Sequence, residues 1–339
     1  AIARGRLHFQ NAPEPRTDPQ VIIDEPWYPE WANVGKPLAL DFPDSWCTNG
    51  KSVQLHTTPR LVPEGGEKST LAINGLRATF TPTIRGDYWY ELAATDGTYS
   101  SPAFHLALPA FDAALGRDDS HAILLYRFDE GKGNIVHDRS KVAPAINLNV
   151  MSGVAWLPGQ GVTTHLSDWM YTNSAEKLKA LADKRAFTIE LWVSTDTIYP
   201  PNPPTPWKGC MLAWEQSPTQ RNLAVGQWSE NFCATGTGDF DTNNTACMLS
   251  GGGFRIGLRH LAVTWDGTNT TLYMNGLKAA TKALAWNPAQ WDLSAPLILG
   301  NQQDGQRPYL GTFYLLAIHD ACLSEAQLLR NYQAGPSAR

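Results

Sequence analysis

The stretch HLAVTWDGTNTTLYMNG, residues 260–276, decides the fold of the second half of the chain. Apolar side chains alternate along its first strand and would share one face of an extended backbone: Leu261, Val263 and Trp265. The Asp-Gly pair at 266–267 predicts a tight turn, and the Asn-Gly pair at 275–276 offers residues that accept a positive φ for a second turn. The segment therefore predicts an antiparallel meander.

Three further patterns extend this picture along the chain. The stretch FTIELWV, residues 187–193, alternates in the same way and predicts a half-buried strand. Near the end of the chain, Ser324 and Gln327 form an S-x-x-Q capping box and Gly335 follows, so one short helix is expected there. A second short helix is predicted over residues 174–183.

The composition of the whole chain favours an all-β protein. Its 339 residues include 28 Gly, 24 Pro, 13 Trp, 11 Tyr and 11 Phe, a mixture that suits short strands joined by many turns. The net charge of −5 argues against a nucleic-acid or anionic-membrane binder. Because no run approaches the roughly 18 apolar residues that span a bilayer, we expect a soluble chain without a transmembrane segment.

Changes in pattern along the chain predict its domain organisation. Residues 1–30 carry five prolines and predict an extended arm, which would lie over its own domain or dock on another subunit. Short apolar runs punctuated by turns predict a β-sandwich over residues 31–109. Residues 110–120 are expected to be a linker, and a second set of strand patterns fills residues 121–335.

The second set of patterns also carries a family resemblance. The blocks LLYRFDEGKG at 124–133, FTIELWV at 187–193, the meander at 260–276 and LSEAQ at 323–327 follow one another in order. In this arrangement residues 121–335 resemble the laminin-G-like branch of the concanavalin A-like jelly rolls. The resemblance implies a jelly-roll sandwich that recognises a protein or carbohydrate surface.

The first sandwich carries a weaker resemblance. Gly86, Tyr88 and Tyr90 resemble the corner that precedes the penultimate strand of immunoglobulin-like or PKD-like modules. Tyr90 stands where antibody-type domains carry a cysteine, so no inter-sheet disulfide is expected. The expected fold is thus an immunoglobulin-like sandwich followed by a concanavalin-type jelly-roll sandwich.

Some jelly rolls of this superfamily are glycosidases, so paired carboxylates need a test. Such enzymes need two carboxyl groups about 5 to 9.5 Å apart. Asp129 and Glu130 are adjacent and would face opposite sides of a strand, while Glu190 and Asp196 would lie roughly 20 Å apart. We therefore expect no catalytic residues, and a glycoside hydrolase whose carboxylates converge from separate strands is the third-ranked alternative.

One loop offers oxygen ligands at alternate positions, as the first half of a calcium loop does: Asp239, Asp241 and Asn243. Asn244 and Ser250 stand where an EF-hand needs Gly and Glu, and the alternative is a solvated turn. The resemblance to jelly rolls implies a structural calcium near the first strand, which makes Asp129 and Asp138 further candidate ligands.

The cysteines indicate the cellular compartment in which the protein folds. Cys233 and Cys247 are predicted to form a disulfide, since they flank a Gly/Asp/Asn-rich loop whose entropy a bridge would reduce. The partners of the other three cysteines stay open: Cys47, Cys210 and Cys322. Five cysteines and a first residue Ala1 fit an oxidising compartment and a removed leader, so a secreted, periplasmic or cell-surface protein is expected.

Tryptophans in or beside loops are the candidate ligand-binding residues: Trp207, Trp228 and Trp169. An exposed indole suits stacking on a sugar or anchoring a protein interface, and the proline-rich insertion 199–208 would present Trp207 on a stiff loop. The alternative is that each indole folds down as a lid on its own sandwich. The sequence as a whole favours a non-catalytic accessory subunit of a larger assembly that recognises protein surfaces, with a carbohydrate-binding adhesive module as the alternative.

Overall fold

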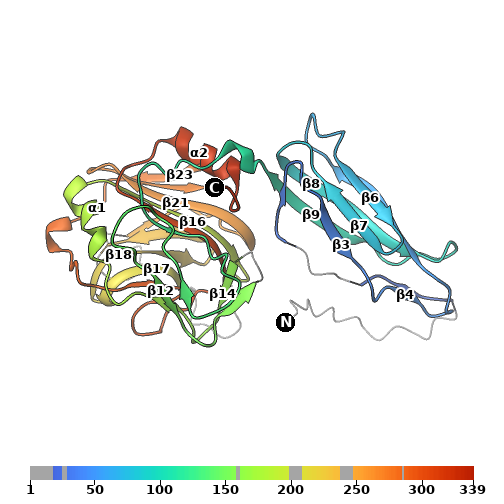
Figure 1. Ribbon diagram of the computed structural model, residues 1–339, viewed down its shortest axis with the longest axis horizontal. Helices are drawn as coiled ribbons and strands as arrows, with labels where there is room; N and C mark the ends of the chain where they lie inside the picture. The colour runs from blue at the N-terminus through green and yellow to red at the C-terminus, as the bar shows by residue number, and fades with distance from the viewer. Residues whose placement is uncertain (1–17, 25–28, 158–160, 198–207, 237–246, 285) are drawn as a thin grey trace. The chain divides into compact units, whose positions relative to one another are not determined.

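The computed structural model describes residues 18–24, 29–157, 161–197, 208–236, 247–284 and 286–339. The chain divides into two compact units, Ala1–Ala114 and Leu115–Arg339. Nearly all of the regular structure is strand, which confirms the all-β prediction (Figure 1). No helix in the described part of the chain is both long enough and apolar enough to cross a membrane.

The first unit is a β-sandwich. Its four-stranded sheet has the order β2-β9-β8-β5, its three-stranded sheet has the order β3-β7-β6, and β1 pairs with β4. Side chains of both larger sheets share one core, as Phe80 and Tyr90 do. The strands are β1 (Val21–Ile22), β2 (Ala32–Asn33), β3 (Leu38–Asp41), β4 (Trp46–Cys47), β5 (Gln54–Leu61), β6 (Thr70–Asn74), β7 (Arg77–Thr81), β8 (Gly86–Thr95) and β9 (Phe104–Phe111), followed by the 3-10 helix η1 (Ala113–Leu115).

Buried and exposed side chains alternate along the first residues of β8. Tyr88 and Tyr90 point into the core, while Trp89 between them is exposed. The Tyr88 hydroxyl donates a hydrogen bond to the backbone oxygen of Ile84 at 3.0 Å, the contact to an upstream backbone group that a tyrosine corner makes. Assignment to the immunoglobulin-like or PKD-like class stays a prediction.

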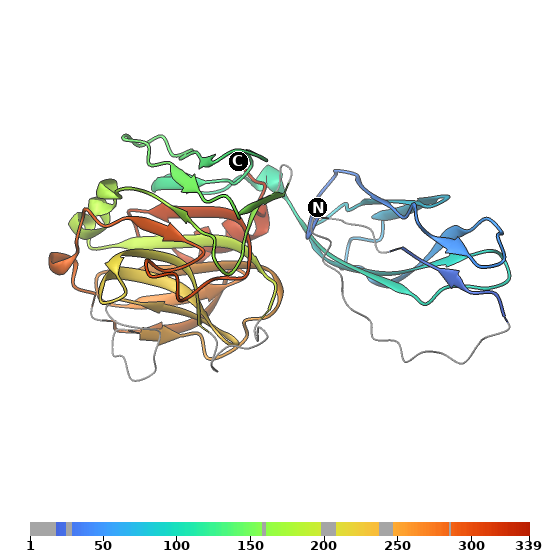
Figure 2. The same ribbon diagram turned by 90° about the horizontal axis from the view of Figure 1, so that it is seen from below.

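The second unit consists of two eight-stranded sheets, which we call the β16 sheet and the β17 sheet, packed in layers (Figure 2). The β16 sheet contains β10 (Ala122–Tyr126), β13 (Ala155–Leu157), β14 (Gly161–Thr164), β16 (Phe187–Thr195), β21 (Gly257–Trp265), β22 (Thr270–Met274), β23 (Leu277–Lys282) and β25 (Gly311–His319). The β17 sheet contains β11 (Ile135–Val136), β12 (Leu148–Val150), β15 (Met170–Tyr171), β17 (Lys208–Ser217), β18 (Gln220–Trp228), β19 (Asn231–Thr235), β20 (Cys247–Leu249) and β24 (Leu297–Leu299). The helices are η2 (Glu176–Leu178), α1 (Lys179–Lys184), η3 (Pro288–Gln290) and α2 (Glu325–Ala334).

The predicted meander is present as β21, β22 and β23. Its second turn uses Asn275 and Gly276, both with positive φ, at 52° and 75°. Gly276 also allows a close approach, since a Cβ there would lie 3.1 Å from side-chain atoms of Leu329 and Tyr332 on α2. The meander thus fixes the position of the closing helix as well as the order of the strands.

Helix α2 begins with the predicted capping box, in which Ser324 and Gln327 satisfy each other's backbone N–H groups. Leu328 of this helix packs with Ala262 and Tyr273 on the face of the β16 sheet that is turned away from the core (Figure 1). The helix therefore covers the outer face of that sheet.

Because α2 covers this outer face, the prediction that β16 is half-buried is wrong. The alternation of residues 187–193 predicts a half-buried strand, but every residue of β16 is buried. One face contacts the core between the sheets, and the other lies beneath α2 and Arg117, which reaches it from the predicted linker. A strand covered on both faces carries no solvent-facing side chains.

Candidate functional site

Strand register aligns one residue from each strand of the β17 sheet in a continuous row: Ile135, Asn149, Tyr171, Ile298, Ala213, Ala224, Thr235 and Cys247. Neighbours along these strands, such as Leu148 and Met170, point into the core, so the row lies on the outer face of the sheet. The row is buried from Ile298 onward, whereas Ile135 and Tyr171 are 39% and 37% exposed. We call Ile135, Asn149 and Tyr171 the open patch.

Two of the predicted tryptophans lie against this same outer face. Trp169 and Trp228 are half-buried and pack on its apolar cluster, whose members are Cys210, Ala213, Ala224, Cys233, Cys247 and Ile298. The ammonium of Lys208 lies 4.8 Å from the ring centre of Trp228, and the Trp169 ring lies 3.6 Å from where a Cβ of Gly305 would be. Trp207 lies outside the described residues. The structure thus brings Trp169 and Trp228 to one face.

A buried ion pair stands at the end of β17. Arg221 Nε lies 2.5 Å from Glu215 Oε2, and both side chains are almost completely buried. The backbone N–H of Gln303 donates to Glu215 Oε1 at 2.8 Å, and Arg221 Nη2 donates to Gln302 Oε1 at 3.0 Å. Both oxygens of the Glu215 carboxylate are therefore bonded, one to Arg221 and the other to the loop after β24.

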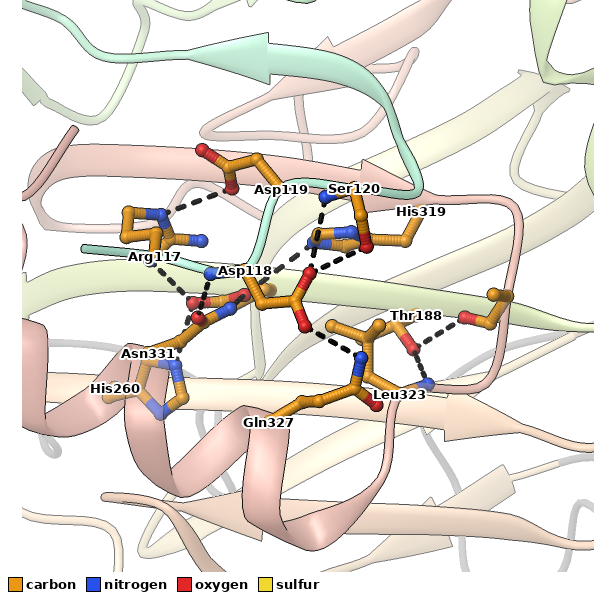
Figure 3. Close-up of polar contacts among 12 residues, drawn as sticks. Arg117, Asp118, Asp119, Ser120, Thr188, His260, His319, Leu323, Gln327 and Asn331 are labelled. Carbon is orange, nitrogen blue, oxygen red and sulfur yellow. Dashed lines mark hydrogen bonds and ion pairs between the residues drawn. The ribbon is translucent and has the colours of Figure 1, made fainter. Parts of the chain in front are cut away.

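A second buried charge cluster surrounds Glu190 of β16. Figure 3 labels its members Arg117, His260 and Asn331. Arg117 Nη1 donates to Glu190 Oε1 at 2.8 Å, and His260 Nε2 lies 2.9 Å from the same oxygen. Asn331 of α2 donates to the other carboxylate oxygen at 2.9 Å and accepts from the backbone N–H of Asp118 at 2.7 Å. The cluster therefore joins a central strand to the predicted linker and to the closing helix.

The electrostatics of this cluster fix the charge of Glu190. Burial alone would raise the pKa of its carboxyl group, but the charge of Arg117, the hydrogen bond with His260 and the nearby imidazole of His319, whose Nε2 lies 3.6 Å from Oε2, hold that pKa well below its ordinary value. Glu190 stays ionised and has no surface exposed to a substrate. Its carboxylate links β16 to Arg117 and to α2.

The candidate calcium ligand Asp138 is engaged by a lysine. Its carboxylate accepts hydrogen bonds from the backbone N–H groups of Leu125 and Ser140 at 3.2 and 2.9 Å, and it binds the Lys177 ammonium. Three further oxygens surround that ammonium at 3.0 to 3.1 Å: Ser140 Oγ, Val142 O and Pro144 O. The ammonium therefore supplies the positive charge in this cage of oxygens.

The candidate calcium ligand Asp129 has a different partner. Asp129 pairs with Arg139 at 3.3 Å near the surface. Asp239, Asp241 and Asn243 fall in a segment that the structure does not describe. Within the described ranges, no group of three or more His, Cys, Asp or Glu side chains is placed to hold a metal. Calcium binding stays a prediction.

Comparison with known proteins bears on the second unit. Residues 167–329 match the family profile Laminin_G_3, described as the concanavalin A-like lectin/glucanases superfamily. This match supports a concanavalin A-like domain within the second unit, Leu115–Arg339. A comparison with curated proteins finds no match.

Among solved structures, the similarities are distant. The binding domain of botulinum neurotoxin serotype D/C has a TM-score of 0.48 and 13% identity, covering 64% of this chain and 52% of that one. The same kind of domain in complex with rat synaptotagmin II has a TM-score of 0.47, 13% identity and the same coverages. A Trypanosoma rangeli sialidase mutant displaying trans-sialidase activity has a TM-score of 0.49 and 11% identity, covering 73% and 42%. This chain spans about half the length of the neurotoxin chains.

The predicted disulfide between Cys233 and Cys247 stays a prediction. Cys233 and Cys247 lie on neighbouring strands, but Cys233 pairs with Leu249 and Cys247 pairs with Thr235. The two cysteines are therefore diagonal neighbours on one face of the sheet.

The sequence did not predict the contact between Arg117 and Glu190. Arg117 lies in a segment that reads as a linker, and its partner Glu190 is 73 residues away. One signal could have indicated such a contact, because a glutamate in a strand that is otherwise apolar needs a charged partner if that strand is central. The sequence alone does not say which arginine supplies it.

Proposed function

We propose that this chain is a non-catalytic binding protein, an accessory subunit that docks on a protein partner within a larger extracellular or periplasmic assembly. The proposal rests on the open patch. It aligns an aliphatic, an amide and an aromatic side chain on three adjacent strands, a width of about 10 Å. Aromatic and apolar side chains with few charges characterise the centre of protein interfaces.

The polar groups of the open patch favour a protein over a sugar. Asn149 supplies its only side-chain amide, and Nδ2 of that amide lies 3.4 Å from the backbone oxygen of Tyr171, to which it donates. A sugar needs several directional partners for its hydroxyl groups, whereas a protein surface can fill a flat apolar patch by shape.

The ion pairs of Glu190 and Glu215 support a role without catalysis. Glycoside hydrolysis needs one carboxyl group that gives and takes a proton and a second one on the other side of the scissile bond. Glu190 and Glu215 are buried in the strands of the jelly roll, and each is bound to an arginine. Neither carboxylate is placed to meet a substrate.

The mass of the native particle tests this proposal. The tagged chain is expressed in its own host and purified gently, and the particle is measured by light scattering. Tyr171→Glu places a charge in the open patch and should reduce the particle to the mass of the single chain. Leu277→Glu is the matched control, because Leu277 of β23 is 63% exposed on the other sheet. A wild-type particle with the mass of one chain, or an intact particle with Tyr171→Glu, would refute the proposal.

A further inference from the structure

The first unit carries an exposed apolar row on the outer face of its four-stranded sheet. Register aligns Leu61 of β5, Trp89 of β8 and Ala107 of β9. Leu61 and Trp89 are 49% and 40% exposed, whereas Tyr88 and Tyr90 on either side of Trp89 point into the core. An outer sheet face is normally polar, so a large aromatic and a leucine side by side on it are unusual.

Polar side chains border this row on one side. Glu91 follows Trp89 on the same face of β8, and Arg60 Nη2 donates to its Oε2 at 2.5 Å. His105 Nδ1 lies 3.9 Å from the other carboxylate oxygen of Glu91, and the His105 ring centre is 6.0 Å from that of Trp89. On the other side of Trp89, Asp87 is exposed. The indole thus lies among donors and acceptors.

The charges of Arg60 and Glu91 offset each other, and the exposed Asp87 leaves this border with one negative charge. The hydrogen bond from Arg60 lowers the pKa of Glu91, so the carboxylate is ionised and its charge is matched by the guanidinium. Such a pair has acceptor and donor sites left for uncharged hydroxyl groups but no net charge that would attract an ionic ligand. The site therefore favours a neutral ligand that has an apolar face and hydroxyl groups around its edge.

We propose that the face formed by Leu61, Trp89 and Ala107 is a binding site for neutral saccharides. A sugar ring stacks its C–H face on the indole of Trp89, while its hydroxyl groups bond the Glu91 carboxylate and the Arg60 guanidinium. Ala107 of β9, opposite Trp89, contributes only a methyl group to this face. The site is in the first unit, outside the residues that match the concanavalin A-like profile, and it does not depend on the proposed function of the jelly roll.

Affinity electrophoresis of the full chain tests this site. Native gels contain one neutral polysaccharide each, namely xyloglucan, galactomannan, laminarin or arabinoxylan, and a carrageenan gel serves as the acidic comparison. At least one neutral polysaccharide should retard the wild-type chain. Trp89→Ala should weaken that retardation by about tenfold in apparent affinity, since it removes the stacking surface. Glu91→Gln should weaken it less, because the amide retains one acceptor.

Trp46→Ala is the matched control, because Trp46 of the same unit is 51% exposed but lies on the β1–β4 ribbon, opposite Ile22. It should bind as the wild-type chain does. Four results would overturn the proposal: no retardation by any neutral polysaccharide, retardation by carrageenan alone, equal losses for Trp89→Ala and Trp46→Ala, or a Trp89→Ala variant that lowers the native particle mass without changing retardation. The last result would make this face a protein contact.

Discussion

Replacing Arg117 with methionine tests whether the Glu190 cluster holds the second unit together. The Arg117 and Glu190 side chains are both completely buried, and their ion pair measures 2.8 Å. Methionine keeps much of the apolar stem but leaves a buried carboxylate without its cation. Breaking a buried pair from one side costs about 3 to 5 kcal/mol. For a unit of this size, that corresponds to a fall in Tm of roughly 6 to 20 °C.

Differential scanning calorimetry of the full chain, with the transition of the second unit followed, measures this loss. Arg139→Met is the control, because its ion pair with Asp129 is half exposed and should change stability by less than about 1 kcal/mol. The double variant Arg117→Met with Glu190→Leu should recover much of the loss, since it removes the uncompensated charge. A loss for Arg117→Met no larger than that for Arg139→Met would refute the reasoning.

Three further predictions follow from the same contacts. Because the folded pKa of Glu190 lies well below its ordinary value of 4.5, the stability that its ionisation provides is present above about pH 4.5 and is lost as the pH falls through the folded pKa; thermal melts of Glu190→Gln should therefore depend less on pH in that range, and a slope equal to that of the wild type would contradict this. If calcium raises the Tm, Asp239→Ala should abolish the rise while Asp138→Ala should retain it, because Lys177 already occupies the Asp138 carboxylate; loss of the rise in Asp138→Ala alone would show the opposite. Gly276→Ala should lower stability in urea unfolding by more than Gly257→Ala, since both glycines have positive φ but only the Gly276 Cβ would meet α2; equal losses would show that α2 does not constrain that turn.

Local patterns in the sequence predict the strands and their turns well. Alternation and the Asn-Gly pair place the meander of β21 to β23, because both depend on residues that are neighbours in the chain. The capping box of Ser324 and Gln327 is likewise a matter of four consecutive residues, and it is present as predicted. These features form wherever the local backbone can adopt them.

Contacts between distant segments could not be predicted in this way. The alternation of β16 indicates two faces but not that α2 and Arg117 cover the second one. Whether Cys233 can reach Cys247 depends on the register of β19 and β20, which the loop between them does not specify. The open patch likewise exists only because the register places Ile135, Asn149 and Tyr171 side by side.

Hydrogen–deuterium exchange of the isolated chain and of the native particle tests the central claim most directly, because it reports which backbone segments a partner covers. The account predicts slower exchange in the particle for peptides that contain residues 133–137, 147–151 and 169–173, which form and flank the open patch. Unchanged exchange in these three segments, with protection confined to the strands of the β16 sheet, would contradict it.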